Sequence, residues 1–148
     1  MFMIRHFAAT LALAAALGPF GPSAQAQAAK SAYQMEWVYR VKYGFQDEWW
    51  RIFQKYEIAA LDEEKRLGYV VDYYIDVPDL HASEDVRWDY RIIITFKDRD
   101  AATHEDEVTR ALFADQAAFR RDENRRWELT ANHWDLPIHK IDPHTPSD

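Results

Sequence analysis

Residues 35–43 (MEWVYRVKY) and residues 45–67 (FQDEWWRIFQKYEIAALDEEKRL) decide the fold, because the hydrophobic period changes between them. In the first segment apolar and polar side chains alternate, which is typical of a β-strand with one buried face. In the second, apolar side chains recur every three or four residues, which is typical of an amphipathic helix. Gly44 separates the two segments, and Gly68 follows the helix where a left-handed C-cap is expected. The sequence therefore predicts a strand followed by a helix.

The same alternation continues along the chain. Residues 69–77 and 86–96 predict a second and a third strand, and Pro78 ends the second. Residues 101–124 predict a second helix, and residues 127–138 a last, less regular strand. The order β-α-β-β-α-β predicts an α+β, ferredoxin-like fold, in which a four-stranded antiparallel sheet carries two helices on one face. The sheet residues expected to face the helices are Trp37, Tyr39, Val41, Tyr73, Ile75, Trp88, Tyr90, Ile92 and Ile94.

Residues 1–28 have the three parts of a secretory signal peptide. Arg5 precedes an apolar run that is too short to span a bilayer, and Ala24-Gln25-Ala26 is a small–x–small cleavage pattern. An uncleaved N-terminal anchor is the alternative. We therefore expect a periplasmic or secreted protein that is exported through a Sec-type signal. The rest of the chain is expected to comprise a loose linker (29–34), a single domain (35–140) and a loose tail (141–148).

Composition excludes several classes of function. The chain has no Cys, which excludes disulfides, thiolate chemistry and Cys-based zinc sites. Its net charge is −7, and removal of the signal peptide would remove a further positive charge, Arg5. Nucleic acids and anionic membranes need clustered Lys and Arg, so neither is an expected partner. With four Gly in the whole chain, a Gly-rich phosphate loop is not expected either.

The opposite face of the predicted sheet mixes both signs of charge with apolar residues. It is expected to carry Arg40, Lys42, Asp72, Asp76, Arg87, Asp89 and Arg91, with Val38, Tyr74, Ile93 and Thr95 between them. Asp72 or Asp76 is expected to pair across the ladder with Arg87 or Arg91. A solvated face is one interpretation, since exposed ion pairs contribute only about 0–1 kcal/mol each. The other is a homodimer contact, which needs nearly complete pairing because breaking a buried pair costs about 3–5 kcal/mol.

Several local features resemble the dimeric α/β-barrel superfamily: the element order, the helix opening at Phe45, the Leu67-Gly68 helix end and the Phe96-Lys97-Asp98 strand exit. This superfamily includes stress-responsive barrel proteins, polyketide cyclases and antibiotic-biosynthesis-type monooxygenases. The resemblance covers residues 35–138 and is one of topology. It implies a homodimer in which two sheets form a barrel, with a pocket between helices and sheet in each subunit.

Haem-degrading members of that superfamily use an Asn on the first strand, a Trp at the end of the third and a His on the second helix. Here residues 35–43 contain no Asn, the third strand ends with Phe96, and only His104 could be matched. The resemblance therefore does not imply haem breakdown. We expect no cofactor and no metal ion.

His104 with Tyr90 is the candidate catalytic pair, because a histidine beside an aromatic hydroxyl can act as a general acid or base. The alternative is a locally hydrogen-bonded His104 at a helix start. His133 is a further candidate, and His81 lies in an acidic loop that could hold a metal ion but reads more simply as a solvated turn. The candidate ligand pocket comprises Trp37, Tyr39, Tyr56, Tyr73 and Trp88, which would otherwise be core.

Two main hypotheses on function remain, and a third possibility is a module that pairs with another exported protein. The first is an exported homodimeric module that binds a ligand or has a structural role. The second is a cofactor-free enzyme of the cyclase, isomerase or monooxygenase type that acts on an aromatic or apolar small molecule.

Overall fold

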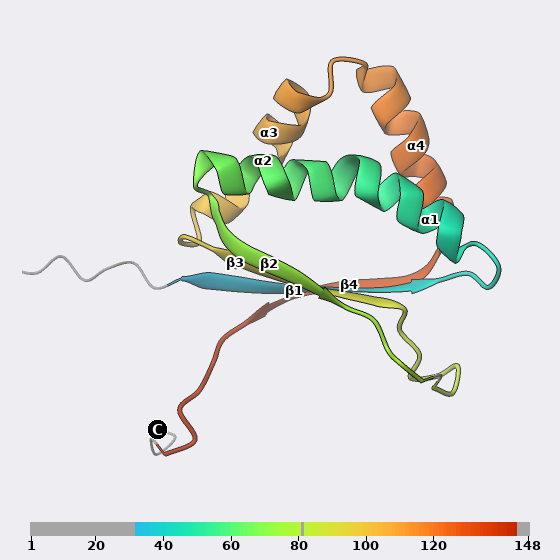
Figure 1. Cartoon of the computed structure of the whole chain (residues 1–148), viewed down its shortest axis with the longest axis horizontal. Coiled ribbons are helices and arrows are strands. Elements are labelled where there is room, and N and C mark those ends of the chain that lie inside the picture. The colour runs from blue at the N-terminus through green and yellow to red at the C-terminus, as the bar shows by residue number, and fades with distance from the viewer. Residues whose placement is uncertain (1–31, 81, 145–148) are drawn as a thin grey trace, which may run out of the picture.

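The structure is a computed structural model that describes residues 32–80 and 82–144 (Figure 1). The predicted signal peptide and His81 lie outside these residues. The elements, in chain order, are β1 (Tyr33–Val41), α1 (Gln46–Phe53), the π-helix η1 (Gln54–Ile58), α2 (Ala59–Leu67), β2 (Val70–Asp76), β3 (Tyr90–Phe96), the 3₁₀-helix η2 (Ala101–Thr103), α3 (Glu105–Leu112), α4 (Gln116–Leu129) and β4 (Thr130–Ile138).

The four strands form one sheet in the order β2-β3-β1-β4, and every pair of neighbours is antiparallel. Trp37 lies opposite Ile92 on β3 and opposite Asp135 on β4. All the helices lie on one side of the sheet (Figure 1). This is the ferredoxin-like arrangement that the sequence predicts.

The first helical run continues through α1, η1 and α2, and Gly68 ends it. Gly68 has a φ of 81°, so the predicted left-handed C-cap is confirmed. The second helical region departs from the prediction, because it is not one helix. Phe113 is extended, and the Asp115 side chain accepts hydrogen bonds from the backbone N–H groups of Ala117 and Ala118, which starts α4 in a new direction.

Two predicted strand boundaries also change. The helix α4 runs on to Leu129, so Trp127 lies in a helix and the last strand begins at Thr130. The third strand begins at Tyr90, because the residues before it bind the end of β1 through side chains. Asp89 Oδ2 accepts the Val41 N–H at 2.7 Å, and Arg87 Nη2 donates to the Val41 carbonyl at 2.7 Å. The first strand begins at Tyr33, two residues earlier than predicted.

The core lies between the sheet and α1–η1–α2. Trp49, Phe53, Leu61, Ile92 and Ile94 are at most 1% exposed. Most residues predicted to face the helices do so: Trp37, Tyr39, Val41, Ile92 and Ile94 are buried, and Tyr73, Ile75 and Tyr90 pack against the core cluster half-buried. The exception is Trp88, which lies in the loop before β3.

The opposite face of the sheet is less charged than predicted. Arg91 pairs with Asp76 at 2.7 Å, as expected across the ladder, but Asp72 pairs with Lys65 of α2. Val38 and Ile93 are buried on this face at 3% and 6% exposure, while Tyr74, Trp134 and Leu136 are exposed. Beside them is a hollow of about 250 Å³, lined by Gln34, Asp72, Tyr74, Ile93, Thr95, Ile138, His139 and Lys140.

Candidate ligand-binding site

A cavity of about 440 Å³ lies between the β1–β4 half of the sheet and the helices η1, α3 and α4. We call it the β1–β4 cavity. The residues that line it are Tyr33, Met35, Trp37, Tyr39, Tyr56, Glu57, Phe96, Arg99, Ala102, Thr103, Glu105, Asp106, Thr109, Phe119, Glu123, Arg126, Trp127, His133 and Asp135.

The break between α3 and α4 explains why this half of the molecule is hollow. From their junction the two helices diverge toward the sheet, with α3 beside α2 and α4 beside α1 (Figure 1). Beneath the space between them, β4 presents His133 and Asp135 opposite Tyr39 and Trp37 of β1. The polar side chains of β4 do not fill the space above the sheet with apolar atoms as Ile92 and Ile94 do on β3.

Aromatic rings form the floor and one wall of the cavity. His133 stacks on Tyr39 with a centroid separation of 4.1 Å and an interplanar angle of 16°, and Trp127 meets His133 edge-on at 5.1 Å. On the wall, Tyr56 meets Phe119 edge-on at 5.1 Å. Ring faces and edges of this kind suit a flat apolar or aromatic ligand.

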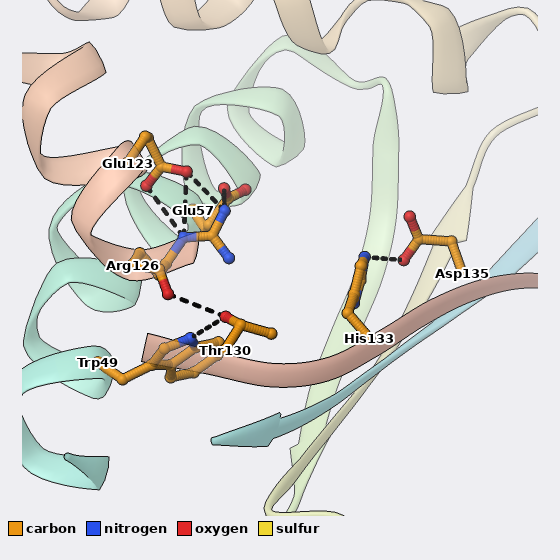
Figure 2. Close-up of polar contacts among 7 residues, drawn as sticks. All are labelled: Trp49, Glu57, Glu123, Arg126, Thr130, His133 and Asp135. Carbon is orange, nitrogen blue, oxygen red and sulfur yellow. Dashed lines mark hydrogen bonds and ion pairs between the residues drawn. The ribbon is translucent and has the colours of Figure 1, made fainter. Parts of the chain in front are cut away.

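Arg126 is the charged centre of the cavity (Figure 2). Its side chain is 2% exposed, its Nη2 donates to Glu57 at 2.7 Å, and its Nε donates to Glu123 at 3.1 Å. The remaining nitrogen, Nη1, is buried and has no hydrogen-bond partner among the described residues. In Figure 2 this nitrogen points away from both carboxylates, toward the side on which His133 lies.

The chain places Glu57 in the cavity by a change of helix type. Glu57 and Tyr56 belong to the five-residue π-helix η1, inserted between α1 and α2. Tyr56 is 4% exposed and the Glu57 side chain 12% exposed, so two consecutive residues are both turned inward and both line the cavity. Short π-helical segments are uncommon and are frequently found at functional sites.

Two carboxyl groups in the cavity, those of Glu57 and Glu105, bind protons more tightly than usual. Burial raises the pKa of Glu57 well above its ordinary value; Arg126 opposes this effect, and the charges of Glu123 and Glu105 add to it. Burial also raises the pKa of Glu105, and the charges of Asp106 and Asp135 add to that effect. The carboxylates therefore repel one another, and the Arg126 guanidinium does not fully compensate them.

The ring of His133 is held between two acceptors. Nδ1 lies 3.1 Å from the Val38 carbonyl oxygen, and Nε2 lies 3.1 Å from Asp135 Oδ1 (Figure 2). A neutral imidazole can donate to only one of these acceptors.

The nearby start of β4 is fixed by Thr130, whose Oγ1 donates to the Arg126 carbonyl and accepts from Trp49 Nε1, both at 2.9 Å.

The structure does not bring the predicted catalytic pair together. His104 lies at the start of α3, stacks on Tyr69 at 4.2 Å, and lines a small surface hollow beside Gly68. Tyr90 is the first residue of β3, and its ring stacks on those of Trp49 and Trp50 with centroid separations of 4.9 Å each. Neither of these two residues lines the β1–β4 cavity.

The predicted ligand pocket is divided. Trp37, Tyr39 and Tyr56 line the β1–β4 cavity. Tyr73 instead donates a hydrogen bond to Asp62 at 2.7 Å, and Trp88 lies beneath the Arg91 guanidinium, 5.2 Å from it. The prediction omits Glu57, Glu123 and Arg126. The available signal was helical spacing: Glu123 and Arg126 follow Phe119 by four and seven residues and therefore share its inward stripe.

Two further searches cover only residues 32–80 and 82–144. No group of three or more His, Asp or Glu side chains in these ranges is arranged to hold a metal ion. No helix within the same ranges is long and apolar enough to cross a membrane.

No family model matches the sequence, and no curated protein matches it. Solved structures do match the fold. A dimeric ferredoxin-like protein from an uncultured marine organism aligns over 80% of this chain and 95% of its own, with a TM-score of 0.53 and 6% identity. A NIPSNAP family protein from Agrobacterium tumefaciens aligns over 77% and 90%, with a TM-score of 0.49 and 17% identity.

A third structure, SnoaB, a cofactor-independent oxygenase from Streptomyces nogalater, aligns over 76% of this chain and 98% of its own, with a TM-score of 0.45 and 15% identity. At such identities the similarity concerns the fold alone. The chain has the fold of the dimeric ferredoxin-like proteins, and the predicted resemblance to that superfamily is confirmed as one of topology.

Proposed function

We propose that this protein is an exported, homodimeric binding module that holds a small aromatic molecule in the β1–β4 cavity. The observation that carries the proposal is Arg126: its Nη1 is buried in a ring-lined cavity and has no hydrogen-bond partner among the described residues. An unsatisfied buried donor costs about 1–3 kcal/mol, more for a charged group. A ligand oxygen that accepts from Nη1 would remove this cost.

The size and the lining of the cavity support the same proposal. Its 440 Å³ falls in the range of small-molecule sites, which is roughly 300–1,000 Å³. Such sites combine apolar and aromatic walls with a few polar groups that orient the ligand. Here the rings of Tyr39, Tyr56 and Trp127 supply the walls and Arg126 the polar group.

The homodimer is proposed from the sheet face that carries no helices. Trp134, Leu136 and Tyr74 expose apolar surface around Val38 and Ile93, and apolar patches of this kind mark interaction surfaces. The similarly folded marine protein is described as dimeric, which supports the same arrangement here. Size-exclusion chromatography with light scattering tests it: the mature protein should have twice the monomer mass, and Trp134→Glu with Leu136→Glu should give a monomer.

Export is proposed from residues 1–28 alone, by the signal-peptide pattern described above. N-terminal sequencing of the protein recovered from a periplasmic fraction should begin after Ala26 or Ala28. Recovery of the uncleaved chain from the membrane fraction would support the anchor instead.

Calorimetric titration with a simple probe, 4-ethylphenol, tests ligand binding. Trp127 is 47% exposed, so Trp127→Ala should leave the fold intact while weakening binding. The matched control is Trp50→Ala, because Trp50 stacks on Tyr90 outside the cavity. We expect saturable binding that Trp127→Ala weakens and Trp50→Ala preserves. Equal effects of the two substitutions would place the binding elsewhere, and absence of binding by this and other small phenols would contradict the proposal.

A cofactor-free enzyme is the second candidate, and the carboxyl pair favours it. Glu57 has a raised pKa and lies beside Glu123 in a cavity, which is how enzymes keep a carboxylic acid protonated for general acid catalysis. Isomerisation through an enol or enolate requires proton transfer at carbon. Aryl ketones with exchangeable α-protons, incubated in D₂O, should therefore exchange faster with the native protein than with Glu57→Gln. Equal exchange rates with the two proteins would exclude Glu57 as a catalytic acid or base and would support a binding module without catalysis.

A further inference from the structure

We propose that the ligand is a hydroxylated arylalkylamine. The oxygen of its ring hydroxyl accepts a hydrogen bond from Arg126, and its ammonium group binds at the acidic mouth of the cavity, formed by Glu105, Asp106 and Asp135. This inference rests on the proposed function, because it names the chemical class of the molecule held in the same cavity.

The cavity is lined by more acidic than basic side chains. Five carboxyl side chains line it, against two arginines: Glu57, Glu105, Asp106, Glu123 and Asp135 face Arg99 and Arg126. Arg126 is already bound to Glu57 and Glu123. No ion pair to Glu105 or Asp106 occurs among the described residues, and the Asp135 carboxylate lies 3.1 Å from His133 Nε2. Among the described residues, no Lys or Arg therefore forms an ion pair with these three carboxylates, although Arg99 also lines the cavity.

The two ends of the cavity differ in how much of their side chains is exposed to solvent. Arg126 is 2% exposed and the Glu57 side chain 12% exposed, so this pair forms the closed end. Asp135 has a side chain that is 45% exposed, and Glu105 and Asp106 also keep exposed surface, so this end of the cavity lies toward solvent. The Glu105 carboxyl is nevertheless desolvated enough by its neighbours to raise its pKa. A ligand that satisfies both ends has an oxygen at one end and a positive charge at the other.

The rings between the two ends suit such a molecule. Tyr39 and Trp127 lie next to Arg126, with ring centroids 5.7 and 5.0 Å from its guanidinium carbon, and Trp37 lies opposite Asp135. An aromatic face attracts a cation within about 6 Å of its centroid, most strongly when the ring belongs to Trp. The same faces stack on an aromatic ligand. Rings combined with carboxylates are therefore the chemistry that recognises an amine attached to a ring.

The repulsion among the carboxylates gives independent support. The charges of Asp106 and Asp135 add to the raised pKa of Glu105. A cation placed among the three groups would relieve this repulsion. Binding of an amine should consequently lower the pKa of Glu105 and release protons from the protein across the titration range of this group, which calorimetry in buffers of different ionisation enthalpy detects.

Three probes with the same phenol ring separate charge from shape: tyramine carries an ammonium group, 4-ethylphenol is neutral, and 3-(4-hydroxyphenyl)propionate is an anion. We expect tyramine to bind about tenfold more tightly than 4-ethylphenol, a ratio that corresponds to about 1.4 kcal/mol. The propionate should bind most weakly. Raising the salt concentration should weaken tyramine binding and leave 4-ethylphenol binding nearly constant.

Glu105→Gln combined with Asp135→Asn should reduce the tyramine to 4-ethylphenol affinity ratio to about one. The matched control is Glu107→Gln on the same helix, because Glu107 is exposed, contacts His104 and does not line the cavity. This control should keep the ratio.

The outcomes distinguish the two proposals. If none of the three probes binds, the proposed function fails. If 4-ethylphenol binds as tightly as tyramine, the proposed function stands and the amine inference is overturned. A tyramine preference that persists in the double variant, or is lost in Glu107→Gln, would also overturn it, because the ammonium would then bind elsewhere.

Discussion

The two halves of the helix-facing side of the sheet differ in how they are filled. Above β2 and β3, the continuous run α1–η1–α2 buries Phe53, Leu61, Ile92 and Ile94 at 1% exposure or less. Above β1 and β4, the divided helices α3 and α4 leave a cavity of about 440 Å³ around Arg126. The same sheet thus carries a dry core beside a polar cavity.

We infer that the two halves contribute unequally to stability, although Trp37, Tyr39 and Val41 of β1 also belong to the core cluster. A close-packed apolar core stabilises the fold mainly through removal of apolar surface from water. A cavity lined by charged groups contributes little by that route, and buried charges are stabilising only while they remain paired. The β1–β4 half is therefore explained better by a ligand than by folding. The predictions below test this division.

Removal of Arg126 should produce the largest effect. In Arg126→Met the carboxyls of Glu57 and Glu123 lose the guanidinium that binds both. Breaking a buried pair in this way costs about 3–5 kcal/mol of unfolding free energy. The loss should be greater at pH 8 than at pH 5, because protonation removes the uncompensated charges. Urea unfolding at both pH values measures it. An equal loss at both would mean that Arg126 acts through packing alone.

Shortening one apolar side chain in each half should give unequal losses. Ile92→Ala, in the filled half, should lower the unfolding free energy by about 2–5 kcal/mol. Met35→Ala should cost about 1 kcal/mol, because Met35 already borders the cavity and loses fewer contacts. Chemical denaturation of both variants gives the comparison. Equal losses would mean that the two halves are filled alike.

Glu64 belongs to α2, which meets α3 at the boundary between the two halves. It is 2% exposed, its Oε1 has no hydrogen-bond partner among the described residues, and burial raises its pKa from 4.5 to about 7. The folded state thus holds this proton more tightly than the unfolded state, so the group's contribution to stability falls from pH 4.5 to about 7 and is constant above. Glu64→Gln should be more stable than the native protein by about 2 kcal/mol at pH 8.

The same Glu64→Gln variant should match the native protein at pH 5, where both side chains are uncharged. Thermal unfolding across this pH range provides the test. The control is Glu63→Gln, whose carboxylate pairs with Arg66 on the exposed side of the helix. A Glu64→Gln advantage that does not depend on pH would assign the effect to hydrogen bonding.

Asp115→Ala should have the smallest effect, about 1 kcal/mol, because it removes the side-chain N-cap of α4. The helix α4 carries Glu123 and Arg126, so fraying at its start should also weaken binding of phenols slightly. Asp115→Asn retains a capping acceptor and should recover most of the loss. Urea unfolding of the two variants measures the difference, and similar losses for both would exclude capping as the cause.

The fold was predictable because each strand has two chemically different faces. Residues 35–43 and 45–67 show the change of period directly, and Gly68 marks the end of the helix. The helix break at Phe113–Asp115 was not predicted, since apolar residues continue through it at helical spacing and only the cap at Asp115 distinguishes it. That break determines where the cavity lies.

The candidate site was predictable only for its rings. Trp37, Tyr39 and Tyr56 stand out in the sequence, and they line the cavity. The Arg126 centre depends on Glu57 and Glu123, which lie far apart along the chain and meet through tertiary packing. His104 is conspicuous in the sequence, yet it lies against Tyr69 outside the cavity.

The most direct test is an NMR titration of the tryptophan indole N–H signals with 4-ethylphenol. Two of the six tryptophans, Trp37 and Trp127, line the β1–β4 cavity. Their signals should shift in a saturable manner, while those of Trp50 and Trp88 should remain in place. Saturable shifts of Trp50 or Trp88 with no change at Trp37 and Trp127 would contradict the assignment of the hollow half as the ligand site.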